Sequence, residues 1–385
     1  MVCEAIEEAH VRSKRGEWWK QDVQTPYLAI KLEEVQRRYR EFRKTMPKAE
    51  VYYAVKANPA RPVASALANL GSSFDVASAN ELLMVLDLGV PPSRISFGNT
   101  VKRAADIQLA YRIGVRHFAA DSIGEIDKLA ALAPGSYVMV RLLVSCQGAE
   151  WPLSRKFGCD REMAVRLLRY AKAVGLQPVG VSFHVGSQQT NPHAWDEPIR
   201  EAAGVFAEMA SDGVELQTLN LGGGFPANYL KRVPTLGEYN AAIEESLRRW
   251  FPERVPELMI EPGRGLVADA GVLVSEVLLS SRKSANDDHR WVYLDCGLFG
   301  GLIEALGEAI RYRIETERDG DLCGPAVIAG PTCDSADLLY ERNPYPLPLS
   351  LRSGDKVRLL STGAYTFTCG MAGFNGFGPL QCICV

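Results

Sequence analysis

The chain contains no long apolar run and no block of charge of a single sign. No stretch approaches the roughly 18 uninterrupted apolar residues of a membrane span, and residues 1–24 carry charges where a secretory signal would have its apolar core. The 43 Lys and Arg residues are interspersed with 46 Asp and Glu residues, for a formal net charge of −3. This balance gives no electrostatic reason to expect a nucleic acid or a membrane surface as partner. We therefore predict a cytoplasmic protein, and small polar substrates remain open.

Cysteine is present, but not in a pattern that pairs. The nine cysteines include no Cys-x-x-Cys motif, and their number is odd. Both facts argue against a disulfide framework, since such frameworks use an even number of cysteines. We predict a reduced compartment and no metal site, and the count leaves room for one reactive thiol.

What the sequence does contain is apolar residues, 47% of 385, which is enough to build two domains. Short β-branched or aromatic runs alternate with segments whose apolar residues have helical spacing. There are eight such runs, at residues 51–57, 73–77, 94–97, 117–120, 137–144, 180–185, 218–221 and 257–260. Eight strands separated by helices predict an α/β fold of the (β/α)8 TIM-barrel type, which we place at residues 32–271.

The pattern changes after residue 271, where strands follow one another with few helices between them. The strand-like stretches are "VLVSEVLLS", "WVYLDCG", "IRYRIETE", "AVIAG" and "DKVRLLSTG", and the N-terminal "PYLAIKL" is of the same kind. We predict a second, β-rich domain formed by residues 1–31 and 272–385.

Polar residues follow the eight barrel runs, and a barrel brings the C-terminal ends of its strands to one rim, where such folds place their chemistry. Taken alone, a strand-end Asp such as Asp75 or Asp121 is about as often a helix cap. The convergence of so many polar residues is harder to explain by structure. The residues are Lys56, Asp75, Ser78, Asn99, Asp121, Arg141, His184, Gly186, Ser187, Gly222, Gly223, Gly224, Glu261, Gly263 and Arg264.

Lys56 follows the apolar run "VYYAV". A lysine held there would be desolvated, which lowers its pKa and leaves a nucleophilic amine suited to Schiff-base formation. The alternative is a surface lysine whose apolar stem is buried, and that is the usual fate of lysine. Lys56 is therefore a candidate nucleophile, and an ordinary surface lysine is the alternative interpretation.

The other rim residues suggest an anion site and a site for a protonated ring. The glycines of "LGGGFP" let backbone N–H groups approach a phosphate, although a glycine run can also make only a turn, and Arg264 could add a bidentate contact. Glu261 could keep a heterocyclic nitrogen protonated. His184 could stack on a ring or transfer protons, and a hydrogen-bonded core histidine is about as common. A lysine, a phosphate cup and a carboxylate together describe pyridoxal phosphate.

These motifs make the sequence similar to the fold type III pyridoxal-phosphate-dependent decarboxylases, and among them to the ornithine/lysine decarboxylase family. The matching stretches run in the family's order from about residue 26 to 378. They are "YYAVKANP", "FDVASANEL", "VSFHVGSQ", "LNLGGGFP", "IEPGRGLVADAG", "GPTCDSAD", "GAYTFT" and "FNGF".

The resemblance implies a fold and a set of roles. It implies an alanine-racemase-like barrel with a β-sandwich, in a head-to-tail homodimer. It implies that Lys56 carries the cofactor, that Glu261 pairs with the pyridine nitrogen, and that His184 stacks on the ring. It assigns the phosphate to Ser187, Gly222, Gly223, Gly224, Gly263, Arg264 and Tyr365, and supporting positions to Asp75, Glu81 and Arg141.

The resemblance also implies that "GPTCDSAD" of the partner subunit completes each active site. Cys333 is then the proton donor, which needs a thiol that is not buried and inert. Asp334 would bind the distal ammonium of a diamino acid by a charge-assisted hydrogen bond. Without the resemblance, Cys333 would be one of nine cysteines, most of which serve as packing.

The substrate is the less determined part of this interpretation. Meso-diaminopimelate and carboxynorspermidine decarboxylases typically have Cys-Glu-Ser where this chain has Cys333-Asp334-Ser335, so the shorter carboxylate favours ornithine or lysine. A second acidic residue for the ammonium falls near Glu304 or Ala305, and the alignment is uncertain by one residue. We predict substrate contacts from Cys333, Asp334, Glu304 and Tyr365. We predict L-ornithine as substrate, with putrescine and carbon dioxide as products, and L-lysine as an alternative or additional substrate.

Two other classes of protein remain as alternatives. A racemase would also use a lysine after its first barrel strand, but it would place a catalytic tyrosine in its β-domain and would not need Cys333 and Asp334. A non-catalytic relative of the antizyme-inhibitor kind would lose cofactor residues, whereas Lys56, Glu261, Arg264 and Cys333 are all present.

Overall fold

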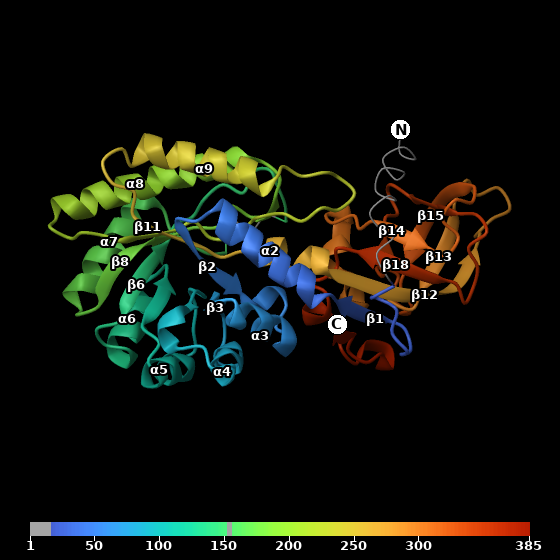
Figure 1. Cartoon of the computed structure of the whole chain (residues 1–385), viewed down its shortest axis with the longest axis horizontal. Coiled ribbons are helices and arrows are strands. Elements are labelled where there is room, and N and C mark those ends of the chain that lie inside the picture. The colour runs from blue at the N-terminus through green and yellow to red at the C-terminus, as the bar shows by residue number, and fades with distance from the viewer. Residues whose placement is uncertain (1–16, 152–155) are drawn as a thin grey trace.

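The computed structural model describes residues 17–151 and 156–385, which form two lobes (Figure 1). One lobe is a closed barrel of eight parallel strands surrounded by helices, and the other consists mostly of β-strands. The predicted fold class is therefore confirmed. None of the helices among the described residues is long and apolar enough to cross a membrane.

All eight predicted barrel strands are present, and they close in the order β10-β11-β2-β3-β4-β5-β6-β8. The first strand is shorter than expected: it ends at Ala54, and Val55–Ala57 form a 3-10 turn. The Asn58 N–H closes this turn on the Val55 carbonyl at 3.0 Å, so Lys56 lies just beyond the strand. The barrel strands are β2 (Ala49–Ala54), β3 (Ser73–Val76), β4 (Ile95–Phe97), β5 (His117–Ala120), β6 (Tyr137–Arg141), β8 (Gln177–Ser182), β10 (Thr218–Asn220) and β11 (Glu257–Ile260).

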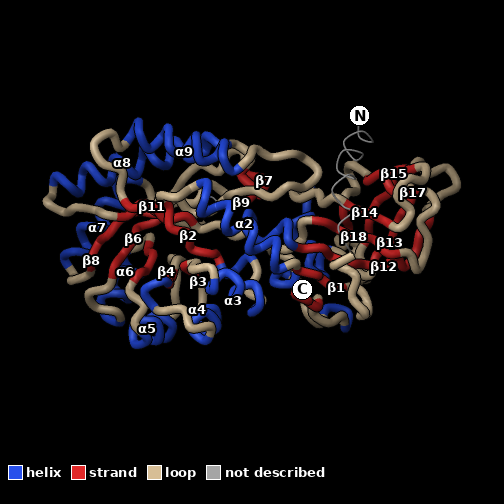
Figure 2. The backbone as a smooth tube through the Cα atoms, viewed as in Figure 1, coloured by secondary structure: helices blue, strands red, loops and turns tan. Residues whose placement is uncertain are grey.

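Helices cover the outside of the barrel, and several begin at the capping residues that their sequences offer (Figure 2). The Thr235 hydroxyl accepts from the Glu238 N–H, and the Glu238 carboxylate accepts from the Thr235 N–H, which is a capping box. The helices are α2 (Leu32–Thr45), α3 (Arg61–Asn69), α4 (Ala79–Asp87), α5 (Ala104–Ile113), α6 (Ile123–Leu132), α7 (Arg161–Ala173), α8 (Asp196–Ser211), α9 (Leu236–Trp250) and α10 (Arg264–Val267).

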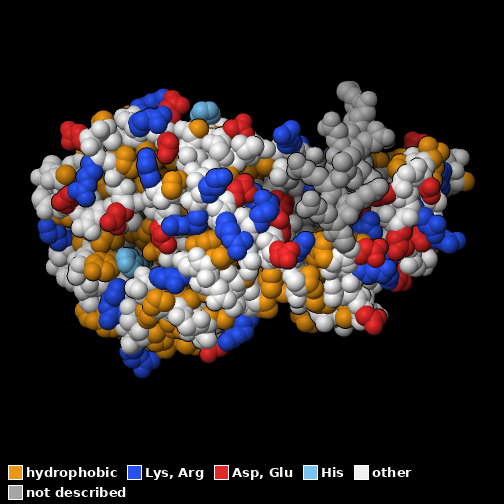
Figure 3. Space-filling view, viewed as in Figure 1, with side chains coloured by type: hydrophobic (Ala, Val, Ile, Leu, Met, Phe, Trp, Pro, Cys, Tyr) orange, Lys and Arg blue, Asp and Glu red, His pale blue; other side chains and the backbone are white. Residues whose placement is uncertain are grey.

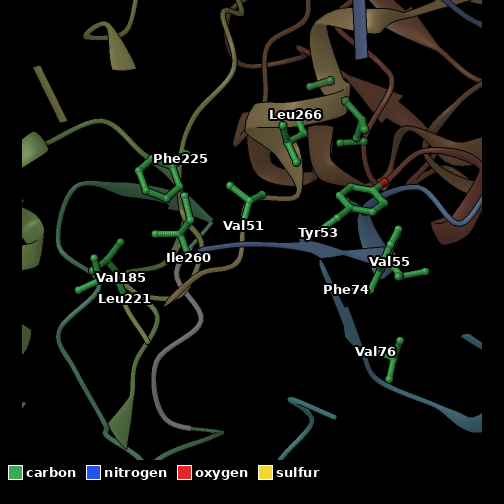
Figure 4. Close-up of a cluster of buried hydrophobic side chains, with 14 of the residues drawn as sticks. Val51, Tyr53, Val55, Phe74, Val76, Val185, Leu221, Phe225, Ile260 and Leu266 are labelled. Atoms are coloured by element: carbon green, nitrogen blue, oxygen red, sulfur yellow. The ribbon is translucent and has the colours of Figure 1, made fainter. Parts of the chain in front are cut away.

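The core between the strands and the helices follows from alternation along each strand. In β2, Val51 and Tyr53 belong to the large cluster shown in Figure 4, whereas Tyr52 packs with Met139 and Met259 in a separate small cluster. Each large apolar side chain buried in this way contributes roughly 1.5–3 kcal/mol. The alternation therefore fixes the register of β2 and with it the position of Lys56.

The mostly-β lobe is built around one long strand, β12 (Gly271–Ser281). Its first half pairs with β1 (Tyr27–Ile30) and β18 (Lys356–Leu360). Its second half pairs with β13 (Arg290–Leu294), with a register shift between Val277 and Leu279. β1 also pairs with β19 (Gln381–Cys384). The remaining strands of this lobe are β14 (Ile314–Thr316), β15 (Cys323–Ala329), β16 (Leu338–Leu339) and β17 (Tyr345–Pro348), and a separate ribbon joins β7 (Ala149–Trp151) to β9 (Ser187–Gln189).

The predicted participation of the "PYLAIKL" segment in the second lobe is confirmed, because β1 lies in its sheet. The domain limits at residues 31/32 and 271/272 stay a prediction. On the face shown in Figure 3, basic and acidic side chains are interspersed over both lobes.

Candidate active site

Lys56 and Asp75 form the centre of the barrel rim. The Lys56 Nζ lies 3.1 Å from Asp75 Oδ2, and the other oxygen of this buried carboxylate accepts from the Gly98 N–H at 3.0 Å. A Cβ atom at position 98 would lie 2.1 Å from Asp75 Oδ1, so only glycine fits beside the carboxylate. Asp75 is therefore held in place as the partner of the lysine, and it does not cap a helix.

The charge of Lys56 differs from the expectation. Burial lowers its pKa, but Asp75, Tyr365 and Glu261 outweigh that effect, so the pKa lies above its ordinary value. The side chain also keeps 45% of its surface exposed, which weakens the desolvation that the sequence implied. The expectation of a lowered pKa was wrong, because the carboxylates that share the rim stabilise the ammonium.

Glu261 follows β11 and lies in the same electrostatic environment. The Asn220 side-chain amide donates to Glu261 Oε1 at 2.6 Å. Burial, reinforced by Asp75, raises the pKa of Glu261 to about 7, while Lys56 and the Asn220 hydrogen bond act in the opposite direction. A carboxylate that ionises with such difficulty favours a nearby cation, such as a protonated ring nitrogen.

His184 follows β8 and is held as a neutral ring. The Gly186 N–H donates to His184 Nδ1 at 3.1 Å, which leaves the proton of the imidazole on Nε2. Burial lowers the pKa of His184 well below its usual value, and Arg141 and Lys56 lower it further. A neutral imidazole is better suited to stacking on a ring than to donating a proton at neutral pH.

The glycines after β10 form a cradle of backbone donors. Gly222 and Gly224 have φ values of +66° and +107°, and a Cβ atom at Gly223 would lie 2.6 Å from the Glu261 carbonyl oxygen. Within the described part of the chain, the N–H groups of Gly223, Gly224 and Gly263 donate to no backbone or side-chain acceptor. Backbone N–H groups that have no acceptor, and that no side chain shields, are well suited to bind an anion such as phosphate.

Arg264 begins α10, and protein groups occupy all five of its N–H donors. Nε and Nη2 donate to Ser187 Oγ at 3.2 and 3.0 Å, and Nη1 donates to the Tyr229 hydroxyl at 2.6 Å. The remaining two donors bind the two carboxylate oxygens of Glu304 at 2.8 and 2.5 Å. Glu304 therefore lies on Arg264, whereas the sequence predicted a contact with the substrate.

Tyr365 comes from the second lobe and reaches the same rim. Its N–H donates to the Ala57 carbonyl at 2.9 Å, and its ring centroid lies 5.0 Å from the Arg264 guanidinium carbon. A Cβ atom at Gly263 would lie 3.1 Å from the Tyr365 hydroxyl oxygen. The same Cβ atom would lie only 2.9 Å from the Ala57 Cβ, and this close approach to the turn after β2 explains why glycine stands at 263.

The other rim residues have partners of several kinds. Glu81 accepts from the Ala77 N–H at 2.7 Å, while Ser78 caps α4. Asp121 accepts from the Gly158 N–H at 2.8 Å, and the Asn99 side-chain amide donates to the Ala77 carbonyl at 3.5 Å. These contacts hold strands and loops together, so Ser78, Asp121 and Asn99 have structural functions here.

Cys333 and Asp334 lie in an exposed loop between β15 and β16. The Cys333 N–H donates to Asn375 Oδ1 at 3.0 Å, and Asp334 Oδ1 accepts from the Ala336 N–H at 2.9 Å. Within residues 17–151 and 156–385, neither side chain hydrogen-bonds to a barrel residue. Among the described residues of one chain, no hydrogen bond therefore links these two side chains to the Lys56 rim.

Three site residues were not identified from the sequence. Asn220 and Tyr229 contact the side chains of Glu261 and Arg264, and Gly98 makes room for Asp75. Asn220 directly precedes the "LGGG" stretch, so its place in that motif was an available signal. Tyr229 carries no such signal, because only the fold brings it to Arg264.

Comparison with known proteins identifies relatives of this arrangement. Residues 32–268 match the family described as pyridoxal-dependent decarboxylase, pyridoxal binding domain. The lysine/ornithine decarboxylase of Selenomonas ruminantium is 36% identical over 92% of this chain and 88% of its own length.

Two solved structures have nearly the same fold. The S. ruminantium lysine decarboxylase with PLP and cadaverine has a TM-score of 0.84 and 35% identity, covering 94% of this chain and 91% of that one. The Vibrio vulnificus lysine/ornithine decarboxylase with cadaverine has a TM-score of 0.84 and 32% identity, covering 100% and 98%.

The rim fits the cofactor that these comparisons indicate, pyridoxal 5′-phosphate. The unused N–H donors of Gly223, Gly224 and Gly263 suit its phosphate, Glu261 suits its ring nitrogen, and Lys56 supplies an amine for its aldehyde.

Proposed function

Because the chain belongs to the fold type III, pyridoxal-phosphate-dependent ornithine/lysine decarboxylase family, we propose that its preferred reaction converts L-ornithine to putrescine and carbon dioxide. It is a pyridoxal-phosphate-dependent decarboxylase of basic amino acids. The single observation that supports the proposed site is the arrangement of Lys56, Asp75 and Glu261 on one rim, beside unused glycine N–H donors.

The rim residues have different roles toward the cofactor. When bound, pyridoxal phosphate supplies an electron sink for the pair left by the departing carboxylate. Lys56 holds the cofactor through its amine. Asp75 accepts a hydrogen bond from that amine and stabilises its protonated form. Glu261 stabilises a positive charge at the ring nitrogen, and His184 offers a neutral flat surface to the ring.

Proton delivery belongs to Cys333 and binding of the distal ammonium to Asp334, both from the partner subunit in a homodimer. The support is their exposure: residues 333–336 are consecutively exposed in one chain. A thiol in contact with water can exchange its proton, which a buried thiol cannot do readily. A carboxylate at position 334 can bind an ammonium by a charge-assisted hydrogen bond.

L-Lysine is the second candidate substrate. It is favoured by the relatives whose names include both lysine and ornithine. Ornithine and lysine differ by one methylene, and a pocket usually discriminates by only about 10- to 200-fold on that basis. Activity on both substrates is therefore compatible with one pocket that contains Asp334.

A panel of basic amino acids tests the substrate. Purified protein with cofactor is assayed for carbon dioxide release from both enantiomers of ornithine, lysine and arginine, and from diaminopimelate. We expect the highest kcat/KM for L-ornithine, followed by L-lysine, with optically pure substrate recovered. Release from diaminopimelate alone would contradict the proposal, and racemised substrate without carbon dioxide would indicate the racemase alternative.

A further inference from the structure

Arg264 and Glu304 form a deeply buried ion pair at the candidate site. The two side chains are 2% and 7% exposed, and they come from the barrel and the mostly-β lobe respectively. The carboxylate meets the guanidinium with both oxygens, which is the strongest geometry for this type of pair. The pair is therefore a fixed unit at the junction between the lobes.

This pairing changes what Arg264 can offer to a phosphate. With Glu304, Ser187 and Tyr229 bound, the guanidinium has no unused N–H donor. Its positive charge is also balanced by a carboxylate in contact with it. The unused donors near the glycine loop are backbone groups, at Gly223, Gly224 and Gly263.

The same pairing limits what Glu304 can offer to a substrate. Both of its oxygens accept from Arg264, and its side chain is almost completely buried. Breaking the pair would leave a buried charge without compensation, which is strongly unfavourable. A distal ammonium would have to compete with a guanidinium that is already in contact.

We propose that Glu304 is a positioning residue: it holds Arg264 against Ser187 and neutralises its charge, and thereby sets how tightly the cofactor's phosphate is bound. The proposal rests on the proposed function, in which the unused N–H donors of the glycine loop and Gly263 take the phosphate of the cofactor. It does not depend on which amino acid is decarboxylated.

Glu304→Gln tests this role, because glutamine keeps the size of the side chain and removes the charge. Cofactor-saturated wild type and variant are dialysed to equilibrium against graded pyridoxal phosphate, and separately against pyridoxal, which lacks the phosphate. We expect the variant to bind pyridoxal phosphate at least about tenfold more tightly, because an uncompensated buried arginine attracts a phosphate dianion. Affinity for pyridoxal should change by less than about twofold, since no phosphate is present.

Two further variants separate charge from shape. Glu304→Asp keeps the charge and should bind pyridoxal phosphate within about threefold of the wild type, as expected for a charge effect. Asp355→Asn is the matched control: Asp355 binds Arg318 with both oxygens at 3.1 Å, within the mostly-β lobe. It should leave both cofactor affinities unchanged. If Glu304→Gln does not fold, the Glu304→Asp measurement decides the proposal, since a tenfold change there would contradict it.

Other outcomes would overturn the proposal. One is equal or weaker binding of pyridoxal phosphate by Glu304→Gln. Another is an unchanged cofactor affinity together with a higher KM for ornithine and lysine, which would assign Glu304 to the substrate's ammonium. The proposed function fails separately, if the wild type binds the cofactor but releases no carbon dioxide from any basic amino acid.

Discussion

The Lys56 rim and the Cys333 loop are the two halves of the predicted site, and they differ in how firmly one chain holds them. On the rim, Asp75 bonds to Lys56 and to the Gly98 N–H, and it is 4% exposed. In the loop, residues 333–336 are all exposed, and Cys333 is linked to the rest of the chain through its backbone N–H. The rim is complete within one chain, whereas the loop has its side chains in solvent.

This difference suggests that the rim binds the cofactor and that the loop contacts the substrate. Cofactor groups need fixed positions, and a rim of packed strands provides them. Groups that contact the substrate can lie on the surface of one subunit, provided that the surface of another subunit faces them. The homodimer that we propose supplies that second surface, and the following predictions test the comparison in order of expected effect.

Lys56→Ala should have the largest effect, because it removes the amine that we propose to hold the cofactor. We expect carbon dioxide release to fall by at least about 10³-fold, which is the order of loss for an essential covalent residue. The measurement is carbon dioxide release under saturating substrate, together with the visible absorbance of the bound cofactor. A variant that keeps both would show that the rim is not the site of attachment.

Cys333→Ala should have a smaller effect, of roughly 10²-fold on product formation, because a proton donor contributes by about that factor. Rim residues do not depend on this thiol, so cofactor absorbance should stay unchanged. Products protonated at the wrong carbon should increase, and mass spectrometry of the amine products detects them. Unchanged turnover and unchanged products would remove Cys333 from the site.

A mixture of the two variants tests whether the halves come from different chains. After exchange of subunits, half of the dimers are mixed, and each mixed dimer has one intact site, so about a quarter of wild-type activity should return. Diamine production before and after mixing is the measurement. If both halves came from the same chain, mixing would restore nothing.

Glu261→Gln should show the smallest effect, in the pH dependence of stability of the cofactor-free protein. The folded carboxyl has its pKa raised to about 7 from 4.5, so the folded state binds the proton more tightly than the unfolded state. This contribution to stability is present at low pH and is lost as the pH rises from about 4.5 to 7.

Glutamine does not ionise, so the Glu261→Gln variant does not lose this contribution to stability as the pH rises. The free energy of unfolding of the variant, relative to wild type, should increase by on the order of 1–3 kcal/mol between pH 5 and pH 8. Urea unfolding at both pH values measures it, with Asp355→Asn as a control that is not expected to follow this trend. Parallel pH profiles of variant and wild type would show that Glu261 ionises normally.

The barrel could be predicted from the sequence because each of its strands is short, apolar and bounded by a helix. The runs at 73–77 and 117–120 correspond closely to β3 and β5. The end of the first strand could not be placed, because a 3-10 turn that begins with Val55 has the same apolar pattern as a strand.

The site was predictable as residue types but not as contacts. Order along the chain identifies Lys56, Asp75 and Glu261 as rim residues. It does not show that Asp75 raises the pKa of Lys56, or that Glu304 approaches Arg264 from the other lobe. Those facts depend on side chains that are distant in sequence and meet only after folding.

Strand β1 is enclosed by β12 and β19, both of which follow the entire barrel in sequence. During synthesis β1 emerges from the ribosome before β12 and β19, so it cannot pair with them until they have been made. The barrel can assemble as a unit before that point. We therefore expect the mostly-β lobe to be completed after the barrel, so that Tyr365 and Glu304 reach the rim at that stage.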